Sequence, residues 1–197
     1  PHDRACHHRA GAAVSKRAPQ FERRERDFYP TPRDAVFPLL PHLAPATRFA
    51  EPCAGDGRLL DHLTAAGHVC VDAWDIEPRR ADIARDDATM ALCHNTDCYI
   101  TNPPWDRRVL HPIILNLSRH KPTWLLFDAD WMHTRQSAEF MPLCRKIVSV
   151  GRVKWIEDSP FTSKDNAAWY LFDANAEGPA CFIGRERQGN LFEERAA

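Results

Sequence analysis

Short apolar runs alternate along the chain with longer segments whose apolar positions recur at helical spacing. The apolar runs predict β-strands at residues 47–52, 69–76, 97–102, 123–129, 146–156 and 167–173. The amphipathic segments predict helices at residues 33–43, 57–66, 78–86, 107–119 and 135–145. Because strands that alternate with helices build βαβ units, we expect an α/β fold with a mostly parallel sheet and helices on both of its faces.

The two ends of the chain differ from this pattern. The last two predicted strands are joined by residues 157–166, which predict no helix, so we expect these strands to form an antiparallel hairpin. Residues 1–26 are rich in arginine, and residues 184–197 are polar. We therefore expect a flexible basic N-terminal arm over 1–26, one domain over 27–183, and a polar C-terminal tail over 184–197.

Composition narrows the classes of protein. The chain has 197 residues, of which 44% are hydrophobic and 27% are charged, as is typical of a globular protein. No apolar run is long enough to cross a bilayer, and we find no signal peptide. The seven cysteines are scattered rather than spaced as a disulfide framework, which favours a reduced cytoplasmic setting with no membrane partner.

The distribution of charge leaves two interpretations of the N-terminal segment open. The net charge of -1 excludes a uniformly basic nucleic-acid binder, but residues 1–26 hold seven basic residues against three acidic ones. This arm either follows a phosphate backbone or is a solvated tail.

Two groups of possible zinc ligands stand close in sequence: Cys93, His94 and Cys98, and Cys6, His7 and His8. Neither group has the paired short spacing of a zinc site, so we expect no metal.

A glycine-containing loop follows the first predicted strand. Gly55 and Gly57 precede a helical apolar pattern, and small residues there let a ligand approach the backbone and the helix N-terminus. Asp75 ends the second strand twenty residues later, where an acidic side chain accepts hydrogen bonds from ribose hydroxyls in nucleotide-binding folds. The dinucleotide fingerprint is incomplete because residue 60 is Leu60, which favours a nucleoside without phosphate, such as S-adenosylmethionine. A simple strand-to-helix turn is the alternative interpretation.

The tetrapeptide "NPPW", residues 102–105, ends the strand predicted at 97–102. Two consecutive prolines fix φ twice and remove two N–H donors, so they stop the strand and hold their neighbours in one geometry. Asn102 places an amide at this rigid point, and Trp105 adds an aromatic ring.

Taken in order, these motifs resemble those of the class I S-adenosylmethionine-dependent methyltransferases, specifically the small phage-type N6-adenine DNA methyltransferases. The resemblance covers roughly residues 27–173 and rests on "DFYPTP", "EPCAGDG", "WDIEP" and "NPPW". It implies a Rossmann-like, mostly parallel sheet of seven strands with an antiparallel C-terminal hairpin. It also implies S-adenosyl-L-methionine as cofactor and DNA as partner. The sequence leaves the oligomeric state open and favours a monomer, and we expect the cytoplasm of a bacterial or phage-infected host cell as its location.

The resemblance also implies roles for single residues. In the catalytic motif, the Asn102 side-chain oxygen and the Pro103 carbonyl accept the two N–H groups of adenine N6, the rigid Pro104 helps to hold them, and Trp105 stacks on the flipped-out base. The implied cofactor-binding residues are Phe28, Tyr29, Thr31, Pro32, Glu51, Pro52, Cys53, Ala54, Gly55, Gly57, Asp75, Ile76, Asp87 and Asn102. The sequence is equally compatible with Thr31 as a helix N-cap before Pro32 and with Glu51 and Asp87 as solvated carboxylates. For Trp105, a core or rim aromatic is the alternative interpretation.

The chain also departs from the family. Sequence-specific members carry a separate target-recognition region, for which this chain has no room, so we expect low or very short sequence specificity. The same acceptors suit RNA adenine or a protein glutamine, although protein glutamine methyltransferases usually show tyrosine where this chain has Trp105. A non-catalytic scaffold is the remaining alternative, and such proteins commonly lose one of the two motifs that are intact here.

Overall fold

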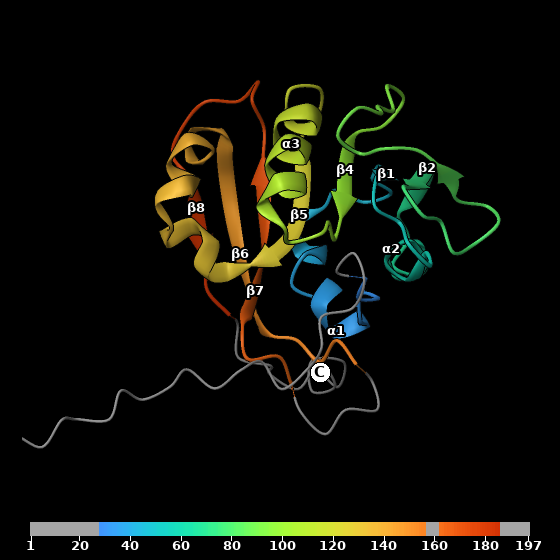
Figure 1. Ribbon diagram of the computed structural model, residues 1–197, viewed down its shortest axis with the longest axis horizontal. Helices are drawn as coiled ribbons and strands as arrows, with labels where there is room; N and C mark the ends of the chain where they lie inside the picture. Colours follow the sequence, from blue (N-terminus) through green and yellow to red (C-terminus); the bar gives the residue numbers. More distant parts are fainter. Residues whose placement is uncertain (1–27, 157–161, 186–197) are drawn as a thin grey trace, which may run out of the picture.

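The computed structural model describes residues 28–156 and 162–185. The predicted basic arm over 1–26 and residues 186–197 of the predicted tail lie outside the described residues. Figure 1 shows that the described chain forms a single sheet with helices packed against it.

The described strands form one eight-stranded sheet in the order β3-β2-β1-β4-β5-β7-β6-β8. Their bounds are β1 Arg48–Glu51, β2 Val69–Asp75, β3 Ala84–Arg85, β4 Cys98–Thr101, β5 Thr123–Asp128, β6 Cys144–Arg152, β7 Asn166–Phe172 and β8 Cys181–Ile183. Neighbouring strands from β3 to β5 pair in parallel, and β7 pairs antiparallel with both β5 and β6. The predicted mostly parallel sheet and its antiparallel C-terminal hairpin are therefore confirmed.

Helices cover both faces of this sheet, as predicted. Helix α3 (Arg107–Ser118) and the 3-10 turns η3 (Ala129–His133), η4 (Arg135–Glu139) and η5 (Met141–Leu143) lie on one face. Leu110, Ile114 and Leu117 of α3 pack there against Tyr99 and Phe127 of the sheet. Helices α1 (Arg33–Val36) and α2 (Arg58–Ala65), with the 3-10 turn η2 (Leu40–His42), lie on the other face. The buried Trp169 ring joins this second core, and its indole N–H donates to the Ala35 carbonyl at 2.7 Å.

Three predicted helices differ in the structure. The helix predicted at 33–43 shortens to α1 and the turn η2, because Pro38 and Pro41 have no N–H to continue an α-helical ladder. The helix predicted at 78–86 is wrong: residues 78–83 form a loop and 84–85 form β3. The helix predicted at 135–145 is replaced by η4, η5 and the start of β6, because the Ser137 hydroxyl donates to the carbonyls of Met132 and Thr134 and stabilises short turns.

Two strands were not predicted. β3 has two residues, and β8 has three, so each is too short to give an alternating pattern in the sequence. With both included, the sheet has eight strands rather than the seven that the resemblance implied.

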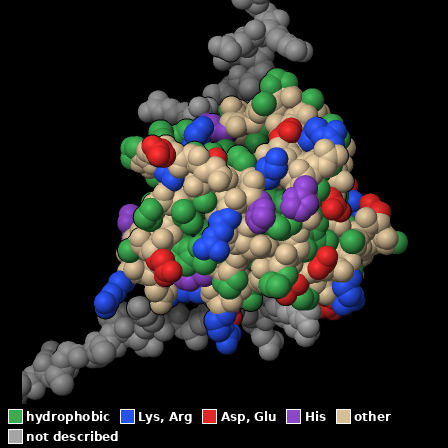
Figure 2. All heavy atoms as spheres, turned by 90° about the horizontal axis from the view of Figure 1, so that it is seen from above, with side chains coloured by type: hydrophobic (Ala, Val, Ile, Leu, Met, Phe, Trp, Pro, Cys, Tyr) green, Lys and Arg blue, Asp and Glu red, His purple; other side chains and the backbone are tan. Residues whose placement is uncertain are grey.

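The surface of the described residues mixes charge with apolar side chains. In Figure 2, which views the molecule from above Figure 1, basic, acidic and histidine side chains are interspersed with hydrophobic ones. None of the helices in the described ranges combines the length and the apolar character that a bilayer crossing requires.

Candidate active site

A cleft of about 650 Å³ opens where the parallel strands end. Glu51 ends β1, Asp75 ends β2, and Asn102 directly follows β4, and all three side chains line the cleft. Ligands of open α/β sheets bind at the carboxyl ends of the strands, and this volume is in the range of small-molecule sites. The structure therefore brings the predicted glycine loop, the acidic strand end and the Asn-Pro-Pro-Trp motif to one place.

The predicted cofactor residues line this cleft, except Pro32 and Gly57. Of the predicted catalytic residues, Asn102 and Pro104 line it, whereas the buried Pro103 and the half-buried Trp105 are not among its lining residues. Asp87 lines the cleft, whereas its neighbour Asp86 is not among the lining residues. The Asp87 carboxylate accepts from the N–H and the hydroxyl of Thr89, both at 2.8 Å.

Asp75 connects the glycine loop to the loop that follows β2. One of its carboxylate oxygens accepts from the Gly55 N–H at 2.9 Å, and the other accepts from the Glu77 N–H at 2.7 Å. The Arg79 N–H in turn donates to the Gly55 carbonyl at 2.9 Å. Gly55 has a φ of +54°, a left-handed conformation that glycine adopts without strain. Asp75 thus holds the shape of the loop in addition to facing the cleft.

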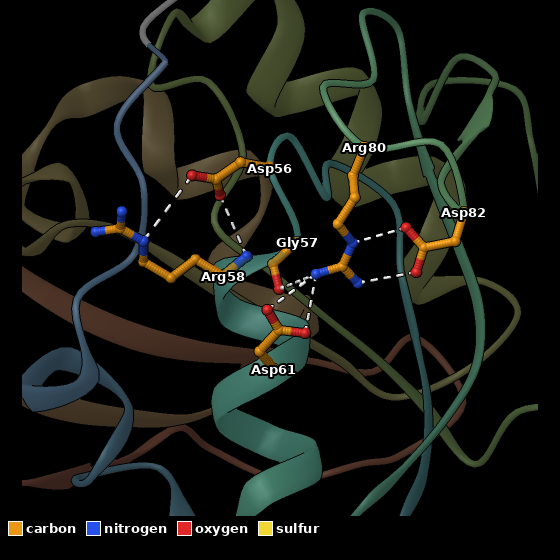
Figure 3. A network of polar contacts seen from close by, with 6 residues as sticks. All are labelled: Asp56, Gly57, Arg58, Asp61, Arg80 and Asp82. Atoms are coloured by element: carbon orange, nitrogen blue, oxygen red, sulfur yellow. Dashed lines mark hydrogen bonds and ion pairs between the residues drawn. The ribbon is translucent and has the colours of Figure 1, made fainter.

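Arg80 ties the other side of the glycine loop to the start of α2 (Figure 3). Its guanidinium donates to both carboxylate oxygens of Asp61 at 2.9 Å and to those of Asp82 at 2.7 and 3.1 Å. It also donates to the Gly57 carbonyl at 3.4 Å. The two acids hold the guanidinium against Gly57, where a Cβ atom would lie 2.3 Å from it. The predicted cofactor-binding residue Gly57 thus contacts Arg80 and is not among the residues that line the cleft.

Phe28 covers the glycine loop from the N-terminal side. The Arg79 guanidinium lies 3.6 Å from the centroid of the Phe28 ring, within the range of a cation–π contact. A Cβ atom on Gly55 would lie 2.7 Å from the same ring. Glycine at position 55 therefore permits the close approach of Phe28, and the segment that begins at Phe28 is held against the loop.

Glu51 is a buried acid at the floor of the cleft. Its exposed fraction is 1%, and its Oε2 atom has no hydrogen-bond partner. Burial raises the pKa of this carboxyl well above its usual value. A buried acceptor without a partner is costly, so a cationic or N–H donor group of a ligand would satisfy this oxygen.

Asn102 is oriented by the segment that follows Phe28. Its side-chain amide nitrogen donates to the Tyr29 carbonyl at 3.3 Å and to the Thr31 hydroxyl at 3.1 Å. Because a backbone carbonyl can only accept, the NH2 end of the amide must face Tyr29. The amide oxygen of Asn102 is left as the polar group that this side chain can offer to a ligand in the cleft.

Three aromatic rings stand beside this amide. The Trp105 and Trp155 ring centroids lie 5.8 Å apart at an interplanar angle of 84°, and the Tyr29 and Trp155 centroids lie 6.4 Å apart. Trp105 also packs against both hydrophobic cores, so its role as a core or rim aromatic is realised in this structure. Trp155 follows β6, fifty residues after Trp105, and the fold brings the two rings together.

Several residues of the cleft were not predicted from the sequence. Glu77, Arg79 and Thr89 line it from the loops after β2 and β3, and Asp106 and Arg108 line it at the start of α3. Asp106 had a local signal, because an aspartate that follows a rigid turn and precedes a helical pattern predicts an N-cap. Its side chain accepts from the Arg108 N–H at 3.0 Å. Arg79 had no such signal, because its contact with Phe28 spans distant segments of the chain.

The possible zinc ligands do not form a site among the described residues. No group of three or more His, Cys, Asp or Glu residues there is placed to hold a metal ion. The Cys93 N–H instead donates to the Tyr99 hydroxyl at 2.9 Å, which fixes the loop before β4. Cys6, His7 and His8 lie outside the described residues.

Comparison with known proteins gives the fold. No family model matches the sequence, and no curated protein matches it. Solved structures that resemble this one include a proposed RNA methyltransferase from Pyrococcus horikoshii, with a TM-score of 0.52 and 15% identity over 74% of this chain and 85% of that chain. A dimethyladenosine transferase from Plasmodium falciparum has a TM-score of 0.50 and 15% identity over 74% and 62%.

A third similar structure is the methyltransferase subunit of a type I restriction-modification system from Streptococcus thermophilus. It has a TM-score of 0.54 and 9% identity over 79% of this chain and 47% of that chain, so this chain spans about half of its length. At these identities the likeness concerns the fold alone. The chain has the Rossmann-like fold of class I methyltransferases, as its sequence motifs predicted.

Proposed function

We propose that this protein transfers the methyl group of S-adenosyl-L-methionine to the exocyclic N6 of a flipped-out adenine in DNA. The observation that carries this proposal is the orientation of Asn102, whose NH2 end is engaged by Tyr29 and Thr31. The remaining amide oxygen is an acceptor at the edge of the cleft, which is what an amino group as substrate requires.

The residues of the cleft fit this cofactor. The unpartnered Oε2 of Glu51 suits the ammonium group of the methionine part, and Gly55 lets a ligand approach the loop backbone. Asp75, Glu77 and Asp87 line the cleft. In the proposed complex, Asp75 and Glu77 accept from the ribose hydroxyls and Asp87 meets the cofactor adenine. The bound cofactor supplies an electrophilic methyl group on a positively charged sulfur.

Asn102 and Pro103 act on the nucleophile. The lone pair of an adenine amino nitrogen is delocalised into the ring, so the nitrogen attacks poorly until its N–H groups are held by acceptors. The Asn102 amide oxygen and the Pro103 carbonyl are those acceptors in the proposed mechanism. The cofactor would supply the methyl group to the nitrogen lone pair and keep the electrons of its C–S bond, and one amino proton would leave to solvent. The rigid prolines align the acceptors before the substrate arrives.

The aromatic rings near Asn102 are proposed to receive the base. Trp105 stacks on the flipped-out adenine in this mechanism and replaces part of the stacking that the base loses on leaving its strand. The edge-to-face contact of Trp105 with Trp155 fixes the plane of the Trp105 ring for that purpose. The packing of Trp105 on both cores supports the same role, because a stacking platform must not move.

DNA as the substrate is supported by one of the similar structures, whose name describes a methyltransferase subunit of a restriction-modification system. We propose low or very short sequence specificity, a monomeric enzyme, and action in the cytoplasm, with the basic segment over 1–26 as an arm and residues 27–183 as the catalytic domain. Phosphate contacts then supply much of the affinity, and the fit of adenine in the site supplies the selectivity.

Methyl transfer from labelled S-adenosylmethionine tests this function. Unmethylated double-stranded DNA, single-stranded DNA and RNA are incubated with the full chain, and the nucleosides are identified by mass after digestion. We expect N6-methyladenine in DNA, spread over many sequence contexts. Methylated adenine in RNA alone would replace DNA by RNA as the substrate, and no methylated nucleoside in any of the three, with cofactor bound, would overturn the proposal.

A further inference from the structure

Thr31 is a buried polar residue whose hydroxyl does not cap the helix that follows it. Thr31 precedes Pro32 and α1, a position compatible with a helix N-cap. In the structure, the N-cap of α1 is Pro32, and no side chain caps this helix. The exposed fraction of Thr31 is 4%, so its hydroxyl needs a protein partner, and that partner is the side-chain amide of Asn102.

The Tyr29 carbonyl and the Thr31 hydroxyl together fix which end of the Asn102 amide faces the cleft. An amide has an NH2 end that donates and a carbonyl end that accepts, and a rotation of 180° about its last bond exchanges the two. The Tyr29 carbonyl and the Thr31 hydroxyl both lie at the NH2 end, at 3.3 and 3.1 Å. Rotation of the amide would turn its oxygen toward the Tyr29 carbonyl, which can only accept, so that hydrogen bond would be lost. The Thr31 hydroxyl would then have to change from acceptor to donor to keep its own bond.

The segment that holds the amide is itself anchored on both sides. Phe28 is packed between Gly55 and the Arg79 guanidinium, at the glycine loop. On the other side, the Ala35 carbonyl of α1 accepts from the buried Trp169 indole at 2.7 Å. Thr31 lies between these two anchors, so its hydroxyl has a fixed position from which to orient another side chain.

We infer that Thr31 is a positioning residue that holds Asn102 with its carbonyl toward the substrate, so that the site accepts an N–H donor and rejects a group that only accepts. This inference rests on the proposed function, because it concerns the nucleophile of that reaction. It differs from the role that the sequence resemblance implied, in which the Thr-Pro step approaches the methionine carboxylate of the cofactor.

The test compares Thr31→Val with Thr31→Ser. Valine has nearly the shape of threonine but no hydroxyl, whereas serine keeps the hydroxyl. We expect Thr31→Val to lower kcat by roughly 10-fold or more with KM for S-adenosylmethionine unchanged, since the lost hydrogen bond acts on the transition state. Thr31→Ser restores most of kcat. Thr47→Val is the matched control, because the buried Thr47 hydroxyl donates to the Ala44 carbonyl outside the cleft, and its kcat stays at the wild-type value.

A second measurement does not depend on activity. The side-chain NH2 signals of Asn102 are assigned by nuclear magnetic resonance from their absence in Asn102→Asp, and they are expected to shift in Thr31→Val and to stay close to their wild-type positions in Thr31→Ser. Unshifted signals in Thr31→Val would overturn the inference, as would a raised KM for the cofactor with an unchanged kcat. If the wild-type protein methylates no nucleic acid, the proposed function fails, while the shift of the Asn102 signals still decides whether Thr31 orients the amide.

Discussion

Replacement of Gly57 by alanine tests the contact between the glycine loop and Arg80. Gly57 has a φ of +78°, and an alanine Cβ there would lie 2.3 Å from the Arg80 guanidinium. The variant therefore suffers two separate effects. Its backbone is held in a left-handed conformation that side chains disfavour, and the guanidinium must leave the position in which it bonds to Asp61.

The magnitude follows from these two effects. A left-handed conformation costs an L-residue roughly 1–2 kcal/mol. The pair between Arg80 and Asp61 is largely solvated, with side-chain exposed fractions of 28% and 60%, and such pairs contribute up to about 1 kcal/mol. We expect Gly57→Ala to lower the free energy of unfolding by roughly 1–3 kcal/mol in total. Gly67 supplies the control, because its φ is +91° and no atom lies within 4 Å of a Cβ built on it.

The assay is urea denaturation followed by circular dichroism, with thermal unfolding as a check. Gly67→Ala is expected to show the backbone effect alone, so its Tm should lie about 2–4 °C above that of Gly57→Ala. In an Arg80→Ala background, Gly57→Ala should lose its extra cost and match Gly67→Ala. An equal effect of Gly57→Ala in both backgrounds would refute the reasoning, because the clash with Arg80 would then contribute nothing.

Three further predictions concern the cleft. Burial raises the pKa of Glu51 in the folded protein, so the stability that its protonated form contributes is present below about pH 4 and is lost as the pH rises toward the folded-state pKa. Glu51→Gln should therefore gain stability relative to wild type between pH 5 and pH 8 in urea denaturation without cofactor, and a pH-independent difference would contradict the buried acid. Asp75→Ala loses the acceptors of two backbone N–H groups and should lower the free energy of unfolding by roughly 2 kcal/mol, whereas a stability equal to wild type would show that these bonds do not hold the loop. Trp105→Ala should lower it by roughly 2–3 kcal/mol and Trp105→Phe by about 1 kcal/mol, since the ring packs on both cores without being fully buried. Equal effects of the two Trp105 variants would contradict this packing.

Local signals in the sequence located most of the cleft. The glycine loop, the acidic residue at the end of β2 and the Asn-Pro-Pro-Trp turn can each be recognised from a few consecutive residues. Parallel strands then bring these three motifs to one edge of the sheet, because all three follow the carboxyl ends of strands. The helices α2 and α3 were predicted for the same reason, because their apolar positions repeat within a single segment.

Contacts between distant segments were not predictable from the sequence. Residues 78–86 read as a helix, but Arg80 bonds to Asp61 of α2, and the Arg79 N–H bonds to Gly55, so the segment is held as a loop. The hydrogen bonds from Asn102 to Tyr29 and Thr31 span more than seventy residues. Neither periodicity nor a sequence motif predicts these long-range hydrogen bonds, because they depend on how the strands are ordered in the sheet.

The order of the last strands in the sheet was also only partly predictable from the sequence. The antiparallel pairing of β6 and β7 was predicted, because no helix connects them. The insertion of β7 between β5 and β6 was not, because the sequence does not show which edge of the sheet the hairpin joins. The loops after β5 and β6, and hence the contact of Trp155 with Trp105, are placed by that insertion.

The most direct test of the account compares Asn102→Ala with the wild type in methyl transfer to double-stranded DNA. Asn175→Ala is the matched control, because Asn175 is an exposed asparagine outside the cleft whose side chain donates to the Arg119 carbonyl. The account predicts N6-methyladenine from the wild type and from Asn175→Ala, and a loss of at least about 100-fold in kcat for Asn102→Ala with the dissociation constant of the cofactor nearly unchanged. An Asn102→Ala variant that methylates adenine at the wild-type rate would contradict it.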